Sequence, residues 1–429
     1  MARPEKQNEQ VPPTTAHSNS GSFTMLISIV VCAVAYVAIS FAKETSLWAR
    51  ETDVTSLPPQ AVMVDPASFA VLGANGTFRT NAFDAGFNPT GTALPFFQVF
   101  DKKFLKVLGS SATITSIASN ATFAFAHEAP IYDAKQDVMY FASNDGGALG
   151  MSDIDHNNKV GTINLKTIPT NLNGTPIEVP VTELNLPDSI QMTNGGTGPF
   201  RGNLILINSG RGNLPPSIAL VNPNPPHNAT VLVDNYFGRQ FNSLNDVKIH
   251  PSGKIFFTDT VYGWLNHFRP QPLLPSQVYR LDPDTRAVRI AATDFDKSNG
   301  IAFNGDGTIA YIADTGSTSG FLGNNQTEPA TIYAFDVHPT TQAFMNRRAF
   351  AFVDSGVPDG VQVDTDGNVY AGCGDGVHVW APDGTLIGKF FIGTTSANMA
   401  FAGPGRLVIL AETKIFLAKI AAKPSLFTS

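Results

Sequence analysis

The feature of this sequence that most constrains its fold is a motif that recurs about every 54 residues. In each copy a polar residue precedes a short strand of alternating apolar and polar residues, a tight turn follows, and a second, apolar strand comes after the turn. Clear copies begin at Glu128, Asn245, Asn299, Asp359 and Asn398, and a weaker copy begins near Gly198. Six copies of one strand–turn–strand unit indicate a repeat architecture rather than several unrelated domains.

A further short apolar strand occurs at a nearly constant distance from three of these starts, at Thr162, Val278 and Ile332. Strand repeats of this length are typical of β-propellers, in which each repeat forms one blade. Gly-containing turns between the strands suit the hairpins of such blades. We therefore predict an all-β, six-bladed β-propeller over residues 53–420.

Two strand-like pieces precede the first copy, at residues 61–73 and 96–109. A propeller closes when a strand from one end of the chain joins the blade at the other end. We therefore expect one of these two pieces to complete the last blade.

The composition agrees with many short strands joined by tight turns and limits the partners. The chain has 37 Gly, 30 Pro and 31 Phe, and its charged residues amount to 15%, against roughly 25% in an average soluble domain. The net charge is -7 and no cluster of Lys and Arg occurs, so a nucleic-acid partner is not expected. Nothing in the sequence indicates a protein partner.

The N-terminal region contains an apolar stretch at residues 23–42 that has no charged residue. About 20 such residues are enough to span a bilayer. The preceding residues 1–22 are polar, and we expect them to form a disordered tail. The stretch is either a transmembrane signal anchor or a signal peptide cleaved after Ala42. Either alternative places the propeller in the secretory pathway, outside the cell or anchored on the non-cytosolic side of a membrane.

Five N-x-S/T sequons without proline at the middle position support export, because all of them follow the apolar stretch. They begin at Asn75, Asn120, Asn173, Asn228 and Asn325. We expect these asparagines to be N-glycosylated.

Four of the six repeat starts carry a side-chain oxygen that suits a metal: Glu128, Asn245, Asn299 and Asp359. The innermost strand of each blade begins near the propeller axis, so these side chains are expected to converge there. Two carboxylates balance the charge of a divalent cation, and two amides leave room for water or substrate. Oxygen ligands favour a hard cation, with Ca²⁺ first and Mg²⁺ or Mn²⁺ after it, while Zn²⁺ is not excluded.

Three other polar residues stand close to these positions in the sequence. His127 precedes Glu128, and strand alternation predicts that the two side chains point to opposite faces. We assign His127 to packing or to holding a ligand, with a contact to substrate as the alternative. Asp259 and Asp314 recur in T-D-T and A-D-T at the end of the second strand, where we expect structural hydrogen bonds.

The chain resembles the family that includes senescence marker protein, gluconolactonase and luciferin-regenerating enzyme and, within it, more closely the fungal lactonohydrolases. Four segments carry the resemblance: HEAPIYD at 127–133, SLNDVKIHPSGKIFFTDTVYG at 243–263, SNGIAFNGDGTIAYIADTG at 298–316 and VPDGVQVDTDGNVYAG at 357–372. The resemblance extends over roughly residues 120–420 and implies the propeller fold that the repeat indicates.

The resemblance also implies an activity and residue roles. It implies a calcium-dependent lactonase that hydrolyses a small-molecule lactone, an aldonolactone or related hydroxy-lactone, to the hydroxy acid. Glu128, Asn299 and Asp359 would bind the metal, and Asn245 would be a fourth ligand or a substrate contact. Asp359 would be the general base that activates water, with Glu128 as the alternative. Sugar lactonases of this family often have arginine where this chain has Ser243.

Two other functions remain open on the sequence. The first is a metal-dependent phosphotriesterase or arylesterase, because such propellers carry similar Glu, Asn and Asp sets. The second is a non-catalytic cell-surface propeller that binds a partner or glycan, since a fold alone does not determine chemistry. In the second case the metal would be structural.

Overall fold

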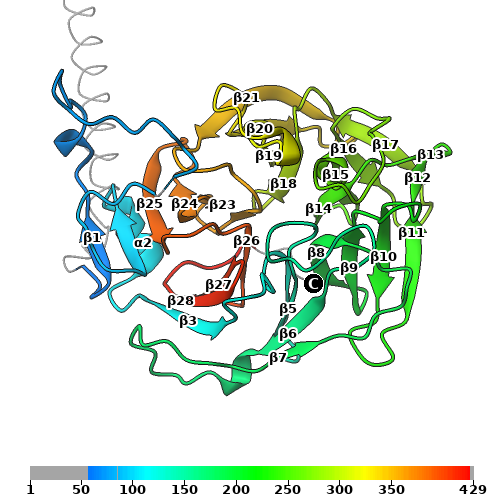
Figure 1. The fold of residues 1–429 in the computed structure, drawn as a ribbon, viewed down its shortest axis with the longest axis horizontal. Helices are drawn as coiled ribbons and strands as arrows, with labels where there is room; N and C mark the ends of the chain where they lie inside the picture. The colour runs from blue at the N-terminus through cyan, green and yellow to red at the C-terminus, as the bar shows by residue number, and fades with distance from the viewer. Residues whose placement is uncertain (1–56, 85, 426–429) are drawn as a thin grey trace, which may run out of the picture. The chain divides into compact units, whose positions relative to one another are not determined.

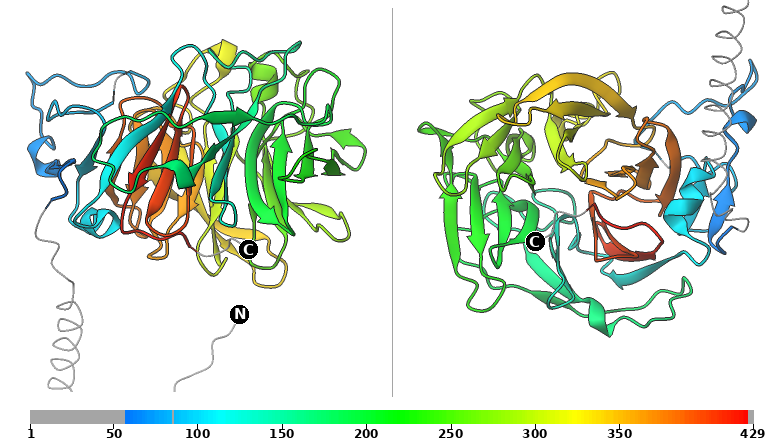
Figure 2. Two further views of the ribbon diagram at one scale, coloured as in Figure 1. Left: turned by 90° about the horizontal axis from the view of Figure 1, so that it is seen from below. Right: turned by 180° about the vertical axis from the view of Figure 1, so that it is seen from behind.

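Each copy of the repeat forms one blade, and six blades stand around a common axis (Figure 1). The computed structural model describes residues 57–84 and 86–425. The blade strands run roughly along the axis, as the side view in Figure 2 shows. The prediction of an all-β, six-bladed propeller is confirmed.

The four strands of every blade pair antiparallel, and in the first five blades they follow one another in chain order from the axis outwards. The first blade contains β4 (Glu128–Asp133), β5 (Val138–Ala142), β6 (Val160–Asn164) and β7 (Val181–Glu183). The second contains β8 (Thr193–Phe200), β9 (Asn203–Asn208), β10 (Ser217–Val221) and β11 (Ala229–Val233). The third contains β14 (Leu244–Ile249), β15 (Ile255–Asp259), β16 (Gln277–Leu281) and β17 (Val288–Ala292).

The remaining blades follow the same plan. The fourth contains β18 (Ser298–Phe303), β19 (Ile309–Asp314), β20 (Thr331–Val337) and β21 (Phe344–Phe352). The fifth contains β22 (Val361–Val363), β23 (Val369–Cys373), β24 (Gly376–Trp380) and β25 (Leu386–Phe391). The sixth contains β26 (Asn398–Phe401), β27 (Arg406–Ala411), β28 (Lys414–Lys419) and β3 (Thr113–Ser119).

Shorter elements lie between the blades and before them. Beyond the four strands of each blade are β1 (Ala61–Met63), β2 (Phe96–Val99), β12 (Asn235–Tyr236) and β13 (Arg239–Gln240). The helical turns are η2 (Pro66–Ser68), α2 (Lys103–Leu108), η3 (Leu165–Thr167), α3 (Tyr262–Leu265) and η4 (Gly320–Leu322).

Ring closure differs from the prediction. Neither predicted piece completes the last blade, because β1 and β2 extend the fifth blade, where β2 pairs with β25. The closing strand is β3, which pairs with β28 from Thr113↔Lys419 to Ser119↔Lys414. The closing segment TITSIAS lies outside the two predicted apolar pieces. It closes the ring because it pairs with β28, although it is less apolar than those pieces. Residues from the N-terminal side therefore hold the C-terminal blade in the ring.

The repeat register is confirmed in five blades and corrected in one. Thr162, Val278 and Ile332 lie in the third strands β6, β16 and β20, as their spacing predicts. The weaker copy does not begin near Gly198, since β8 starts at Thr193. The segment TNGGTGPF has no apolar alternation that would reveal its start.

Apolar side chains fill the space between neighbouring blades. Ile117, Phe141 and Leu410, for example, are buried together between the sixth and first blades. Ile207, Phe257 and Tyr279 form the corresponding core between the second and third. Because each blade packs two faces, burial fixes the blades around the axis and thereby positions the strand starts.

The structure describes only some of the residues on which the export predictions rest. The predicted tail 1–22 and the apolar stretch 23–42 lie outside the described residues. Within the described part of the chain, no helix is long and apolar enough to cross a membrane. All five sequon asparagines (Asn75, Asn120, Asn173, Asn228, Asn325) are exposed, as attachment of a glycan requires. Export and glycosylation stay predictions.

A buried group of charges lies in the fifth blade. Asp375 accepts hydrogen bonds from Nζ of Lys389 at 3.0 Å and from Nε2 of His378 at 2.6 Å, and all three side chains are buried. Lys389 also contacts Asp354 at 2.8 Å. Burial by itself would raise the pKa of Asp375, but the positive charges of His378 and Lys389 hold it well below its usual range.

We expect the Asp375→Asn variant to lose roughly 3–5 kcal/mol of unfolding free energy at pH 7, because Lys389 keeps its buried charge without this partner. Since the pKa of Asp375 is lowered in the folded protein, its contribution is complete above the unfolded value near 4 and declines as the pH falls below it. The difference between wild type and variant should therefore shrink below about pH 4. Urea denaturation between pH 3 and pH 7 measures both effects.

The matched control is Asp336→Asn, which breaks an exposed ion pair with Arg348. This variant should unfold at nearly the same urea concentration as the wild type. A constant gap between Asp375→Asn and wild type across this pH range would contradict the assignment.

Candidate metal centre

The metal-ligand candidates stand at irregularities where the first strands begin. In the third blade Leu244 pairs with Asp259 and Val247 pairs with Phe257, so Asn245 and Asp246 lie opposite the single residue Thr258. Such a two-against-one arrangement is a β-bulge, and it re-aims side chains locally. The fourth blade repeats the arrangement at Asn299, between the pairs Ser298↔Asp314 and Ile301↔Ile312.

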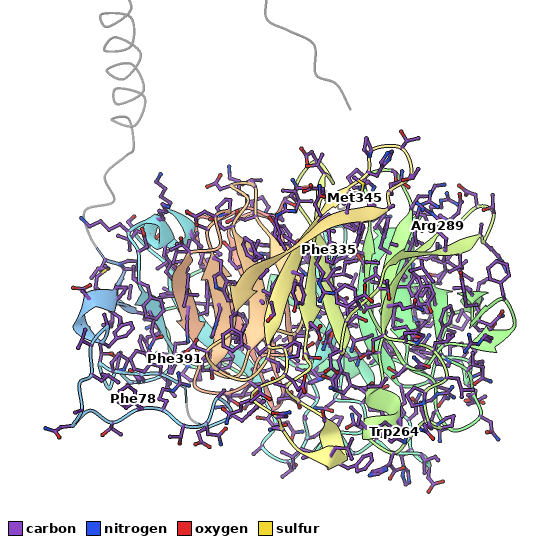
Figure 3. All side chains as sticks on the ribbon, turned by 90° about the horizontal axis from the view of Figure 1, so that it is seen from above. Phe78, Trp264, Arg289, Phe335, Met345 and Phe391 are labelled. Atoms are coloured by element: carbon purple, nitrogen blue, oxygen red, sulfur yellow. The ribbon has the colours of Figure 1, made fainter. Side chains whose placement is uncertain are left out.

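The first strands contact one another around the ring, which brings these starts together at the axis. They begin on the face where the second strands end, since the two strands are antiparallel. In Figure 3, Trp264 of α3 marks this face, and Met345 and Arg289 mark the opposite one.

Three of the four predicted ligands have a buried oxygen that lacks a hydrogen-bond partner among the described residues. These atoms are Oδ1 of Asn245, Oδ1 of Asn299 and Oδ1 of Asp359. A buried polar atom without a partner costs about 1–3 kcal/mol, and native structures contain few of them. The fourth residue, Glu128, is 3% exposed, and its carboxylate lies with that of Asp359 in a group whose ligand atoms are all within 4.8 Å of one another.

The third member of this group is His127, which corrects one prediction. Strand alternation would turn His127 away from Glu128, but both side chains face the same cluster. The reason is local backbone geometry: β4 starts only at Glu128, Ala129 has a φ of 53°, and the pairing with β5 shifts register between Glu128 and Ile131. Alternation does not hold across such an irregularity.

Contacts from the sixth blade hold His127. Its Nδ1 lies 2.6 Å from Oε1 of Glu412, and Nδ2 of Asn144 donates to Oε2 of Glu412 at 3.0 Å. Burial by itself would lower the pKa of His127, but the charge of Glu412 and its hydrogen bond raise it to about 10. Glu412 is therefore a positioning residue that the sequence reasoning missed, since it follows a second strand rather than a repeat start.

Two further residues support the carboxylates. Asn398, at the start of the sixth blade, donates from Nδ2 to Oε2 of Glu128 at 2.7 Å. Asp246 is buried and accepts from the backbone N–H of Ile301 at 2.9 Å, which links the third blade to the fourth. The sequence identified Asn398 as a repeat start but gave it no role, and it did not single out Asp246.

The carboxylates repel one another in this buried place. Burial, followed by the charge of Asp359, raises the pKa of Glu128 well above its usual value. Burial also raises the pKa of Asp359 to about 7, with the charge of Asp246 acting in the same direction. A bound divalent cation would relieve both effects, because it supplies positive charge between the two carboxylates.

The recurring aspartates tether the ligand-bearing starts, which confirms their structural assignment. Asp259 at the end of β15 accepts from the backbone N–H groups of Asn242 at 3.0 Å and Ser243 at 2.9 Å. Asp314 at the end of β19 accepts from the backbone N–H groups just before β18. Each aspartate thus fixes the chain immediately before Asn245 or Asn299.

Ser243 is part of this tether. Its side chain is 1% exposed, and its Oγ accepts from the backbone N–H of Gly263 at 3.0 Å. The residue therefore holds the start of α3 close to β14. A large side chain could not occupy this position without displacing α3.

Glycines after the ligand positions allow the strand starts to approach one another. A Cβ on Gly360 would lie 2.1 Å from Cγ of Asn398, and a Cβ on Gly300 would lie 2.0 Å from the carbonyl oxygen of Asp359. Each glycine thus touches the start of the next blade, and a side chain there would push the two starts apart.

The Gly360→Ala variant should lose roughly 1–3 kcal/mol of unfolding free energy, because the new methyl group clashes with the Asn398 side chain. Denaturant titration measures the loss. Gly305→Ala is the control, since its Cβ would meet only Cβ of Ser425 at 3.9 Å. Equal stability of the two variants would show that the contact at Gly360 is not tight.

Comparisons with known proteins point to one family. Residues 127–412 match the family model described as the SMP-30/Gluconolactonase/LRE-like region. The lactonohydrolase oryL of Aspergillus oryzae is 28% identical over 310 residues, which cover 68% of this chain and 67% of that protein. A gluconolactonase of Zymomonas mobilis is 26% identical over 363 residues, which cover 82% of this chain and 93% of that protein.

A solved structure is also similar. The structure of a gluconolactonase from Xanthomonas campestris matches with a TM-score of 0.59 at 24% identity and covers 78% of this chain and 98% of its own. At this identity the likeness supports the fold alone.

Proposed function

Because the chain belongs to the SMP-30/gluconolactonase/LRE-like family, we propose that it is a metal-dependent lactonase that opens a lactone to the hydroxy acid. The observation that carries the metal dependence is the set of unpartnered buried oxygens on Asn245, Asn299 and Asp359 beside Glu128. Lactone hydrolysis itself is supported by the named activities of the relatives.

The residues fit a divalent cation. Glu128, Asn245, Asn299 and Asp359 offer two carboxylates and two amide oxygens, and a hard cation such as Ca²⁺ prefers oxygen ligands. The two negative charges match the cation's charge. His127 offers a nitrogen to the same cluster, but Nδ1 of its ring already contacts Glu412, so we place it beside the ligands as a substrate contact.

The cation, when bound, would polarise the lactone carbonyl and stabilise the negative charge that develops on its oxygen. Asp359 takes a proton from the attacking water, whose oxygen bonds to the carbonyl carbon. The ring C–O bond then breaks, and the ring oxygen takes the proton from Asp359 to become the hydroxyl group of the product, which returns Asp359 to its carboxylate form. Asp359 suits the role of base better than Glu128, because it is partly exposed whereas Asn398 holds the buried Glu128.

We expect the purified protein to hydrolyse members of a lactone panel containing aldonolactones and unsubstituted γ- and δ-lactones. Activity should disappear with EDTA and return with added Ca²⁺, since Oδ1 of Asn245, Asn299 and Asp359 has no hydrogen-bond partner among the described residues. Acid release in a pH-stat measures hydrolysis, and an aryl phosphotriester assayed in parallel tests the phosphotriesterase alternative. No turnover on either class, with Ca²⁺ still raising the melting temperature, would favour a structural metal in a binding propeller.

The Asp359→Asn variant should lose about 100-fold or more in kcat even when Ca²⁺ is saturating, because the amide cannot accept the proton of water. Steady-state kinetics on the best lactone, with calcium affinity measured separately, distinguish this loss from weaker metal binding. Glu128→Gln is the comparison for the alternative base. A larger loss of kcat in Glu128→Gln than in Asp359→Asn would transfer the role to Glu128.

A further inference from the structure

The second blade has a residue at the same position as the proposed ligands of the third and fourth. In β8, Thr193 pairs with Asn208 and Gly196 pairs with Leu206, so Asn194 and Gly195 form the same two-against-one bulge. In each of these three blades, an asparagine directly follows the first paired residue of the first strand. It is Asn194 in the second blade, Asn245 in the third and Asn299 in the fourth. In the fifth blade Asp359 likewise lies two residues before the first paired residue, Val361.

Asn194 also shares the chemical signature of those residues. It is 5% exposed, and its Oδ1 is buried without a hydrogen-bond partner within the described part of the chain. Of the asparagines in residues 57–84 and 86–425, only Asn194, Asn245 and Asn299 have such an oxygen. The same register and the same unsatisfied atom therefore recur in neighbouring blades.

The amide of Asn194 cannot turn freely. Its Nδ2 donates to both carboxylate oxygens of Asp145 at 3.1 Å, and Oδ2 of Asp145 also accepts from Oγ of Ser209 at 3.2 Å. A flipped amide would point its oxygen at the Asp145 carboxylate. Asp145 therefore fixes which end of the amide remains available.

The backbone around Asn194 lies between two proposed ligands. A Cβ on Gly195 would be 2.5 Å from the carbonyl oxygen of Asn245, and a Cβ on Gly196 would be 3.0 Å from Cβ of Ala129. Asn194 thus stands between the start of the first blade, with Glu128, and that of the third, with Asn245.

We propose that Asn194 is a fifth protein ligand of the cation, an inference that rests on the metal site proposed above. Glu128, Asn194, Asn245, Asn299 and Asp359 then supply five oxygens from five successive blades. Ca²⁺ takes 6–8 oxygen ligands in flexible geometry, so one to three positions remain for water or substrate. Mg²⁺ demands near-ideal octahedral geometry and keeps several waters. The fifth ligand therefore makes the site selective for Ca²⁺ over Mg²⁺.

The test is direct titration of the metal-free protein with Ca²⁺ and with Mg²⁺ by calorimetry, without substrate. Asn194→Ala should weaken Ca²⁺ binding about tenfold or more and weaken Mg²⁺ binding less, so that the ratio of the two affinities falls. The Ca²⁺-induced rise in melting temperature should shrink in parallel. If this variant shows no cooperative melting transition, Asn194→Leu removes the oxygen while keeping a similar volume.

Asn208→Ala is the matched control, since Asn208 is buried in the same blade and both ends of its amide are hydrogen-bonded. It should melt at a lower temperature and keep the wild-type Ca²⁺ affinity. Unchanged Ca²⁺ affinity in Asn194→Ala, or equal weakening in both variants, would overturn the proposal.

The outcomes separate this inference from the proposed function. A wild type that binds Ca²⁺ but opens no lactone, with Asn194→Ala still weakened, leaves the fifth ligand in place and removes only the enzymatic role. Hydrolysis that persists with unchanged Ca²⁺ affinity in Asn194→Ala removes only the fifth ligand. A wild type that binds no Ca²⁺ would overturn both.

Discussion

Within the described part of the chain, buried oxygen atoms without hydrogen-bond partners lie at the strand starts near the propeller axis, and several neighbouring features hold them there. The bulges at Asn245 and Asn299 aim the amides, and the aspartates that end the second strands tether the chain just before them. Gly300 and Gly360, which follow Asn299 and Asp359, let the strand starts touch. A chain that keeps such oxygens unpaired gives up about 1–3 kcal/mol for each, and a ligand recovers this on binding.

The surroundings of the axis divide into two parts. One part contains the residues proposed as ligands, with Asn398 donating to Glu128 and Asn194 donating to Asp145. The other part is the His127–Glu412 contact, where positive charge stands beside the carboxylates. Because Glu412 comes from the sixth blade and His127 from the first, this contact crosses the junction at which the ring closes. Both parts depend on the closed ring, because it keeps the blades at fixed positions around the axis.

The blade repeat could be predicted from the sequence for two reasons. Apolar and polar residues alternate along the blade strands, and the turns between the strands contain glycine. Both patterns recur at one spacing. The four ligand candidates followed from the same register. The position of His127 could not be predicted, since a bulge at Ala129 breaks the alternation and leaves no mark in the residue types. Asn194 was missed because its strand has no apolar pattern, although its Asn-Gly pair matches Asn299-Gly300 and was the available signal. The closing strand β3 depends on long-range pairing, which no local pattern encodes.

That closing strand has a consequence for how the protein reaches its active form. β3 pairs with β28, which lies about 300 residues later in the sequence. β3 can therefore pair only after the last blade has been synthesised. Contacts between such distant segments form slowly and leave strand edges open in the meantime. Before closure, Glu412 has no fixed position relative to His127, and the strand starts have no common axis. The proposed cation site would therefore be complete only after β3 has paired with β28, and a chain truncated before residue 414 would lack this pairing.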